Sequence, residues 1–103
     1  MKVDFRKVTV KGIDGEVVKN ESGEVIFFDV SKELGQEIYS NTSIIPLSDL
    51  AKKIYYDGEV EISEEYAQSV IEHVKNAPFK AVFKSGIIDL IKKSTENEKA
   101  NTI

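Results

Sequence analysis

The sequence predicts an α+β fold, in which an N-terminal three-stranded antiparallel meander packs against three to four short C-terminal helices. Two observations predict it. Residues 3–30 alternate strand-type apolar residues with turn residues, and residues 31–91 carry apolar residues at helical spacing. Strands that precede helices are typical of α+β domains rather than of alternating α/β folds. With 103 residues, 41% of them apolar, the chain has the size and composition of one domain.

The three predicted strands lie near residues 3–10, 16–19 and 25–28, with Gly-containing and Asn-containing turns between them. The apolar positions of the first strand change phase near Arg6 and Lys7, from odd to even residue numbers. This change favours a β-bulge there over a strand with two partly covered faces.

The first predicted helix covers residues 31–40, with Asp29 or Ser31 as its cap. Pro46 suits the first turn of a second helix, because proline lacks the N–H that this turn leaves unpaired. The apolar residues of the second helix follow the spacing of one buried stripe: Leu47, Leu50, Ala51, Ile54 and Tyr55.

Asp57 and Gly58 end this helix, and residues 59–62 predict a brief strand. Ser63 then caps a third helix, which should break at Ala77 because Pro78 disfavours helical geometry in the preceding residue. The buried stripe of the third helix is Ala67, Val70, Ile71 and Val74.

A fourth helix restarts at Phe79 and should end near Ile91. The apolar period stops at Lys92, so we expect a single domain over residues 1–91 and a flexible tail over residues 92–103. The apolar face of the fourth helix consists of Phe79, Val82, Phe83, Ile87 and Leu90, widened by Ile88 and Ile91.

Composition excludes several classes of function. Fourteen basic and eighteen acidic residues give a net charge of -4, which disfavours direct binding to nucleic acids. The chain has no Cys and one His, which excludes redox cysteines and cysteine-ligated zinc. No secretory h-region and no apolar run long enough for a membrane span is present, so we expect a cytoplasmic protein that does not enter membranes.

Two segments are candidate sites for metal binding or catalysis, and in both the residues favour a purely structural role. Residues 57–64 resemble the second half of an EF-hand calcium loop, but Lys53 and Tyr55 would then occupy the early ligand positions, where oxygen ligands are required. His73 is the one side chain with an ordinary pKa near neutrality, and Ser69 lies one helical turn before it. No third group orients the imidazole. We therefore predict no enzymatic activity, no cofactor and no metal site.

An acidic cluster surrounds the predicted strand at 59–62. A solvated face is its ordinary explanation, because strand alternation places glutamates on one side. The alternative is an acidic inhibitor or nucleic-acid mimic that acts on another protein, and a continuous acidic face including Glu72 would favour it. The cluster consists of Glu59, Glu61, Glu64 and Glu65.

Aromatic and apolar residues in the helical region indicate a contact surface. Tyrosine is enriched in protein interfaces because it combines apolar area with a hydroxyl. Tyr39 and Tyr55 fall on predicted core faces, whereas Tyr56 and Tyr66 do not. We expect the fourth helix to self-associate and form a homo-oligomer, because its apolar face exceeds what a small monomer covers. The candidate interaction residues are Tyr56, Tyr66, Phe79, Phe83, Ile88 and Ile91.

Two phrases, DVSKELGQEIY at residues 29–39 and LAKKIYYDGEVEI at residues 50–62, resemble small accessory proteins encoded in prophages and other mobile elements. The resemblance implies a protein that acts through contacts with other proteins, such as a phage assembly factor or a regulator of a host component. It carries over no catalytic residue. The sequence therefore predicts a non-catalytic protein-interaction domain whose partner it does not identify.

Overall fold

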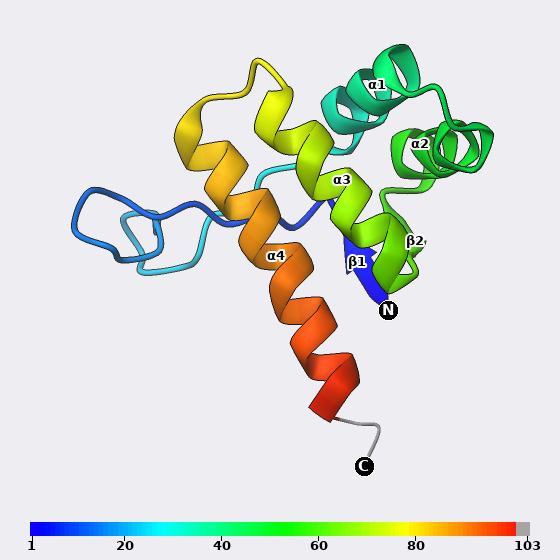
Figure 1. Cartoon of the computed structure of the whole chain (residues 1–103). Helices are drawn as coiled ribbons and strands as arrows, with labels where there is room; N and C mark the ends of the chain where they lie inside the picture. The colour runs from blue at the N-terminus through cyan, green and yellow to red at the C-terminus, as the bar shows by residue number, and fades with distance from the viewer. Residues whose placement is uncertain (101–103) are drawn as a thin grey trace.

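The computed structural model describes the backbone of residues 1–100 and the side chains of residues 1–97. Within these residues a small two-stranded sheet is combined with helices, which dominate the fold (Figure 1). The elements in chain order are β1 (Lys2–Asp4), α1 (Ser31–Asn41), α2 (Ile45–Asp57), β2 (Glu59–Glu61), α3 (Glu64–Asn76) and α4 (Ala81–Ala100).

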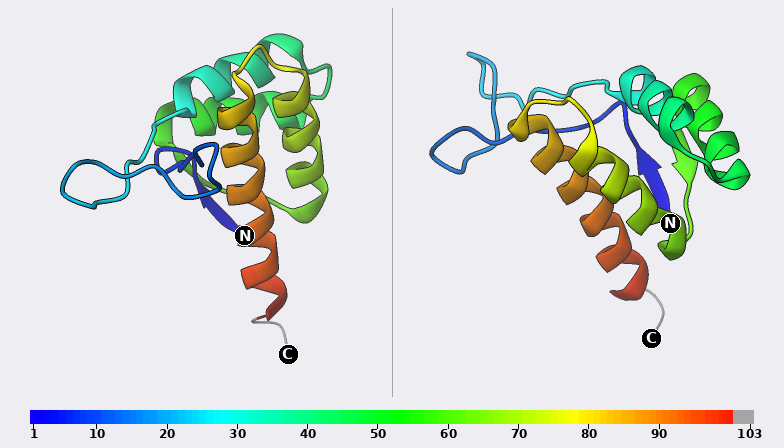
Figure 2. Two further views of the ribbon diagram at one scale, coloured as in Figure 1. Left: turned by 90° about the vertical axis from the view of Figure 1, so that its left-hand side faces the viewer. Right: turned by 45° about the horizontal axis from the view of Figure 1, so that its top comes forward.

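The predicted three-stranded antiparallel meander is wrong. Residues 8–28 instead form an irregular arm, which begins at the fully buried Val8 and whose far end projects away from the helices (Figures 1 and 2). Its turns contain Gly15 and Gly23, both at positive φ. Parts of the arm lie in solvent, since Ile13 is fully exposed and Phe27 is 57% exposed. Paired strands without a covered apolar face are only marginally stable, so the arm does not form a regular sheet. Backbone pairing in the arm is limited to isolated bridges, namely Val8–Phe28, Lys11–Val17 and Lys19–Val25.

The sheet joins two segments that are far apart in the sequence. Strand β1 pairs antiparallel with β2, with Val3 opposite Val60 and both side chains buried. The strand predicted at residues 59–62 is therefore confirmed, but with a partner that local patterning did not indicate. The phase change in the first predicted strand marks a turn: the N–H of Arg6 donates to Asp4 Oδ1 at 3.0 Å, and the strand ends at Asp4.

The first three helices match their predicted positions, but the N-cap of α1 is Val30 and not Asp29 or Ser31, because the carboxylate of Asp29 bonds to Ser31 at the first helical position. Pro46 lies in the first turn of α2, and Gly58 ends this helix with a φ of 76°. Ser63 caps α3, because its Oγ accepts a hydrogen bond from the N–H of Tyr66 at 3.3 Å. The helix ends before Pro78, as the sequence predicts.

Helix α4 differs from its prediction at both ends. Phe79 precedes the helix, and the helix continues past Ile91 through Lys92 to Ala100. The tail was expected to lack regular structure because it lacks an apolar stripe. Thr95 nevertheless reaches the N-terminus, where its hydroxyl donates to the Met1 sulfur at 3.1 Å. Residues 101–103 of the predicted tail lie outside the described residues.

One core connects all of the elements. Helices α3 and α4 run antiparallel side by side, β1 lies against α4, and α1 contacts both α2 and α3 (Figures 1 and 2). The base of the arm joins this core through an edge-to-face contact between Phe28 and Phe83, with ring centroids 5.2 Å apart. The largest fully buried side chains are Phe5, Leu34, Ile38, Leu47, Ile54, Ile62, Ile87 and Ile91.

Among residues 1–100, the helices are too short or too polar to cross a lipid bilayer.

Candidate functional site

Helices α1 and α2 form a hairpin whose closest approach is at Gly35. A Cβ atom placed on Gly35 would lie 2.8 Å from the carbonyl oxygen of Ala51 and 2.8 Å from Cβ of Tyr55. Such distances are too short for non-bonded atoms, so the approach depends on the missing side chain. Gly35 and Ala51 thus bring the two helices together and leave a shallow floor between longer side chains.

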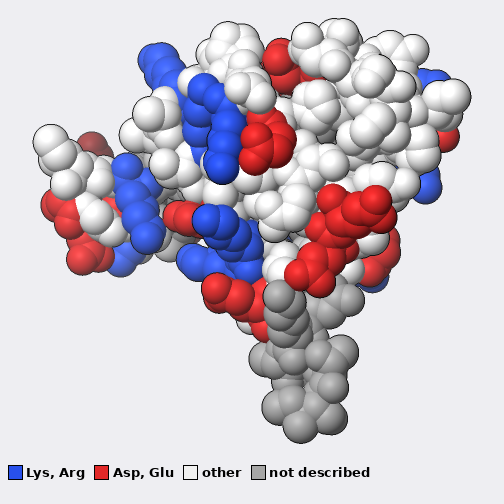
Figure 3. Space-filling model, in the orientation of Figure 1, with Lys and Arg blue, Asp and Glu red and all other residues white. Residues whose placement is uncertain are grey.

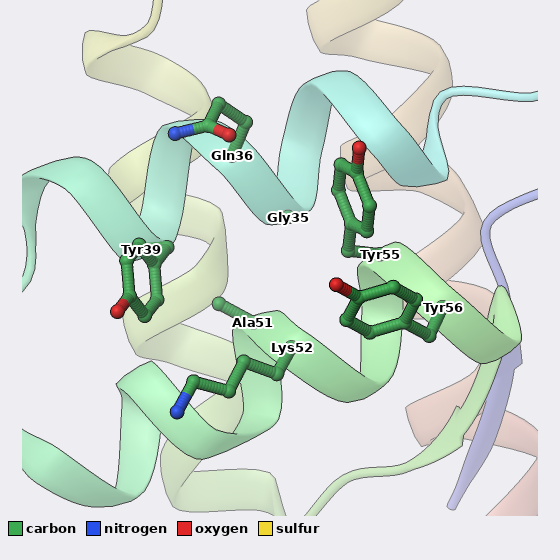
Figure 4. Close-up of a pocket in the computed structure, with 7 residues that line it drawn as sticks. All are labelled: Gly35, Gln36, Tyr39, Ala51, Lys52, Tyr55 and Tyr56. Atoms are coloured by element: carbon green, nitrogen blue, oxygen red, sulfur yellow. The ribbon is translucent and has the colours of Figure 1, made fainter.

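A groove of about 340 Å³ lies over this floor (Figure 4). Tyr39 and Lys52 lie toward one end of the groove, and Tyr55 and Tyr56 lie at the other. The residues that line it are Gly35, Gln36, Tyr39, Ala51, Lys52, Tyr55 and Tyr56.

The aromatic rings of the groove are held in specific contacts. Tyr55 and Tyr56 meet edge to face, with centroids 5.0 Å apart. The Nζ atom of Lys32 lies 4.4 Å from the ring centroid of Tyr55, and Nζ of Lys52 lies 5.6 Å from that of Tyr39. Both distances fall within the range of cation–π attraction, so each ammonium group is placed against a ring.

The groove presents both apolar surface and free hydrogen-bonding groups. Tyr39 is 50% exposed and Tyr56 is 79% exposed. Among the described residues, no hydrogen bond engages the hydroxyls of Tyr39, Tyr55 or Tyr56, and no ion pair engages Lys32 or Lys52. A ligand can therefore engage these hydroxyls without breaking a hydrogen bond, and these ammonium groups without breaking an ion pair, among the described residues.

Of the six predicted interaction residues, only Tyr56 lies in this groove. Four others are partly buried and pack against the core: Tyr66, Phe79, Phe83 and Ile88. Ile91 is fully buried, so the expectation that it extends an exposed face of the fourth helix is wrong. Val82 on the same helix is 47% exposed, so the face is only partly covered, and the homo-oligomer stays a prediction.

Sequence reasoning missed most of the groove, because Tyr39 and Tyr55 were assigned to the core. The available signal was Gly35, a glycine in the middle of a helix where glycine is unfavourable. Such a glycine indicates close approach of a second backbone.

A second groove, of about 430 Å³, lies between the arm and α4. Its charged residues are of both signs, with Lys7, Lys11 and Lys93 beside Asp89, and none of the described residues that line it is aromatic. It therefore offers fewer of the features of a recognition site than the α1–α2 groove.

Among the described residues, the catalytic and metal candidates do not gather into a site. His73 lies on α3 and takes part in no hydrogen bond among the described residues. Lys53 and Tyr55 lie within α2, so residues 57–64 form a helix end, a strand and a cap instead of a calcium loop. Within the described residues, no group of three His, Cys, Asp or Glu side chains is placed to hold a metal ion.

The acidic cluster lies on β2 and on the first turn of α3, where carboxylates gather on the surface (Figure 3). Glu61 Oε1 accepts from the N-terminal ammonium at 2.8 Å. Further along α3, Glu72 lies 3.7 Å from Lys75 Nζ. These contacts place positive charge beside the carboxylates, and the acidic inhibitor or nucleic-acid mimic stays an alternative prediction.

The carboxyl groups with shifted pKa values serve the fold. A hydrogen-bonded ion pair with Arg6 lowers the pKa of Asp4 and raises the pKa of Arg6. Hydrogen bonds from the hydroxyl and N–H of Ser31 lower the pKa of Asp29 at the start of α1. Neither carboxyl lines the groove.

Comparisons with models of protein families, with curated proteins and with solved structures gave no match for this chain. The resemblance to accessory proteins of prophages stays a prediction.

Proposed function

We propose that this protein is a non-catalytic protein-binding domain and that it binds its partner through the α1–α2 groove. The proposal includes the accessory role, in a phage or another mobile element, that the sequence resemblance implies. It also places the protein in the cytoplasm, because a cysteine-free chain gains no disulfide from an oxidising compartment.

The observation that supports the proposal is the set of three tyrosines with unused hydroxyls in one groove. Tyrosine is a frequent hot-spot residue, because its ring fills an apolar pocket while its hydroxyl satisfies a polar group of the partner. Two of these rings are at least half exposed, and each has one ring or cation contact that favours its position. A fixed ring loses little side-chain freedom when a partner binds, which favours affinity.

The test is affinity capture from the native host with three baits: the wild type, a Tyr39→Ser/Tyr56→Ser variant and a Phe27→Ser control. Phe27 is also exposed but lies on the arm, so the control removes an exposed ring away from the groove. We expect wild type and control to capture the same partner and the groove variant to lose at least about tenfold in affinity in a reconstituted titration, the loss typical of a tyrosine hot spot. Capture that does not depend on the groove tyrosines would refute the proposal.

A further inference from the structure

We infer that the α1–α2 groove takes an acidic segment of a partner protein, with an aromatic side chain in the groove and carboxylates on either side of it. This inference rests on the proposed function and adds the chemistry of the partner. It depends on the charge of the groove, on its size and on the placement of its two ammonium groups.

The charge of the groove is opposite to that of the protein. The chain carries a net charge of -4, but none of the described residues that line the groove carries a carboxylate. Its polar groups are three phenol hydroxyls, the amide of Gln36 and the ammonium group of Lys52. All of these can donate hydrogen bonds, and a carboxylate is the acceptor that such a set of donors favours most.

Each of two ammonium groups contacts a tyrosine that lines the groove. Lys52 Nζ lies 5.6 Å from the ring centroid of Tyr39, and Nζ of Lys32, a residue outside the groove lining, lies 4.4 Å from the ring centroid of Tyr55. Neither forms an ion pair within the described residues. A segment that lies along the groove would therefore meet one positive charge before its central residue and one after it.

The size of the groove fits one large side chain. Its volume of about 340 Å³ is near the lower end of ligand sites, which span roughly 300–1,000 Å³. Gly35 and Ala51 leave the middle open, and the flanking tyrosines offer ring faces and edges to an aromatic group.

A single-stranded nucleic acid also combines rings with negative charge, but the groove favours a peptide. Nucleic acid grooves follow a backbone over several nucleotides and stack successive bases on separate rings. The net charge of -4 also disfavours an extended polyanion, which would contact more of the surface than this one small groove. A short acidic segment requires only the two ammonium groups.

The test is an NMR titration of the ¹⁵N-labelled full chain with blocked peptides that place one tryptophan between pairs of aspartates, asparagines or lysines. A short oligothymidylate is the fourth probe. We expect the aspartate peptide to shift the amide signals of Gly35, Tyr39 and Tyr56 and to bind about fivefold more tightly than the asparagine peptide, the effect of two exposed ion pairs. Salt should weaken this preference.

Charge variants separate the groove from the surface as a whole. The Lys32→Gln/Lys52→Gln variant should bind the aspartate peptide only as tightly as it binds the asparagine peptide. Lys53→Gln, an exposed lysine of α2 that does not line the groove, should leave the preference unchanged.

Three results would overturn the inference: equal or tighter binding of the asparagine or lysine peptide, tighter binding of the oligothymidylate, or no shift at groove residues with the aspartate peptide. If groove-dependent capture succeeds while any of these holds, the acidic chemistry is wrong and the proposed function stands. If capture does not depend on the groove tyrosines, the proposed function itself is wrong.

Discussion

Replacing Gly35 with alanine tests the contact on which the groove is built. The new Cβ would lie 2.8 Å from the carbonyl oxygen of Ala51 and 3.0 Å from the backbone nitrogen of Tyr55. Side chains relieve such overlap by rotating, but these two atoms belong to the backbone of α2. The two helices must therefore move apart, and the core contacts on either side of the crossing loosen with them.

The size of the effect follows from two opposing terms. Overpacking a buried contact costs about 1–3 kcal/mol, and fixed backbone atoms place this site in the upper half of that range. Alanine in a helix gains about 1 kcal/mol over glycine, which offsets part of the cost. We expect a net loss of about 1–2 kcal/mol, and each 1 kcal/mol lowers the Tm of a domain of this size by about 4–8 °C.

The assay is urea denaturation followed by circular dichroism, with thermal melting as a second measurement. Ser40→Ala is the matched control, because Ser40 is exposed on the same helix. Its hydroxyl accepts one hydrogen bond, from the exposed side-chain amide of Gln36. The control should stay within about 0.5 kcal/mol of the wild type. A Gly35→Ala protein as stable as the wild type, or more stable, would show that α1 and α2 do not approach closely at this residue.

Two further predictions concern stability. Asp29→Ala should lower the free energy of unfolding by about 0.5–1.5 kcal/mol at neutral pH, because it removes the exposed carboxylate that accepts hydrogen bonds from the N–H and hydroxyl of Ser31 at the start of α1. The pKa of Asp29 in the folded state is lowered below 3.8, so its contribution to stability is present above pH 3.8 and is lost as the pH falls through the folded-state pKa. Denaturation at several pH values should therefore show the stability difference between wild type and variant narrowing in acid. A stability difference that stays constant with pH would contradict this. Ile91→Ala should lose about 2–5 kcal/mol, whereas the partly buried Ile88 should lose less than half as much on the same change, and equal losses in urea denaturation would contradict the burial of Ile91.

The helices could be predicted because their signals are local. The stripe from Leu47 to Tyr55 repeats at helical spacing, and the caps at Gly58 and Ser63 act on neighbouring backbone groups. Each of these features depends on residues within a few positions of one another. The end of α4 is not indicated by this local pattern, because the helix continues to Ala100 although the apolar stripe stops at Ile91.

The strands could not be placed from local pattern. Val3 is opposite Val60, a pairing across most of the chain that no alternation near residue 3 can indicate. The arm shows the converse error. Its apolar residues have strand propensity, but β propensity reflects packing against neighbours. Ile13 and Phe27 lack that cover, so the propensity does not produce strands.

Prediction of the groove requires both the local helical pattern and the packing of residues distant in the sequence. This explains why one of its tyrosines could be predicted as exposed and two could not. Tyr56 lies outside the buried stripe of α2, so helical geometry alone indicates its exposure. Tyr39 and Tyr55 lie on faces that the same geometry assigns to the core. They line a surface because Gly35 lets the helices meet at their backbones, which leaves the large rings at the edges of the contact instead of between the helices. A side chain at position 35 would close the floor and separate the rings, so the position that holds the hairpin together also determines whether the groove exists.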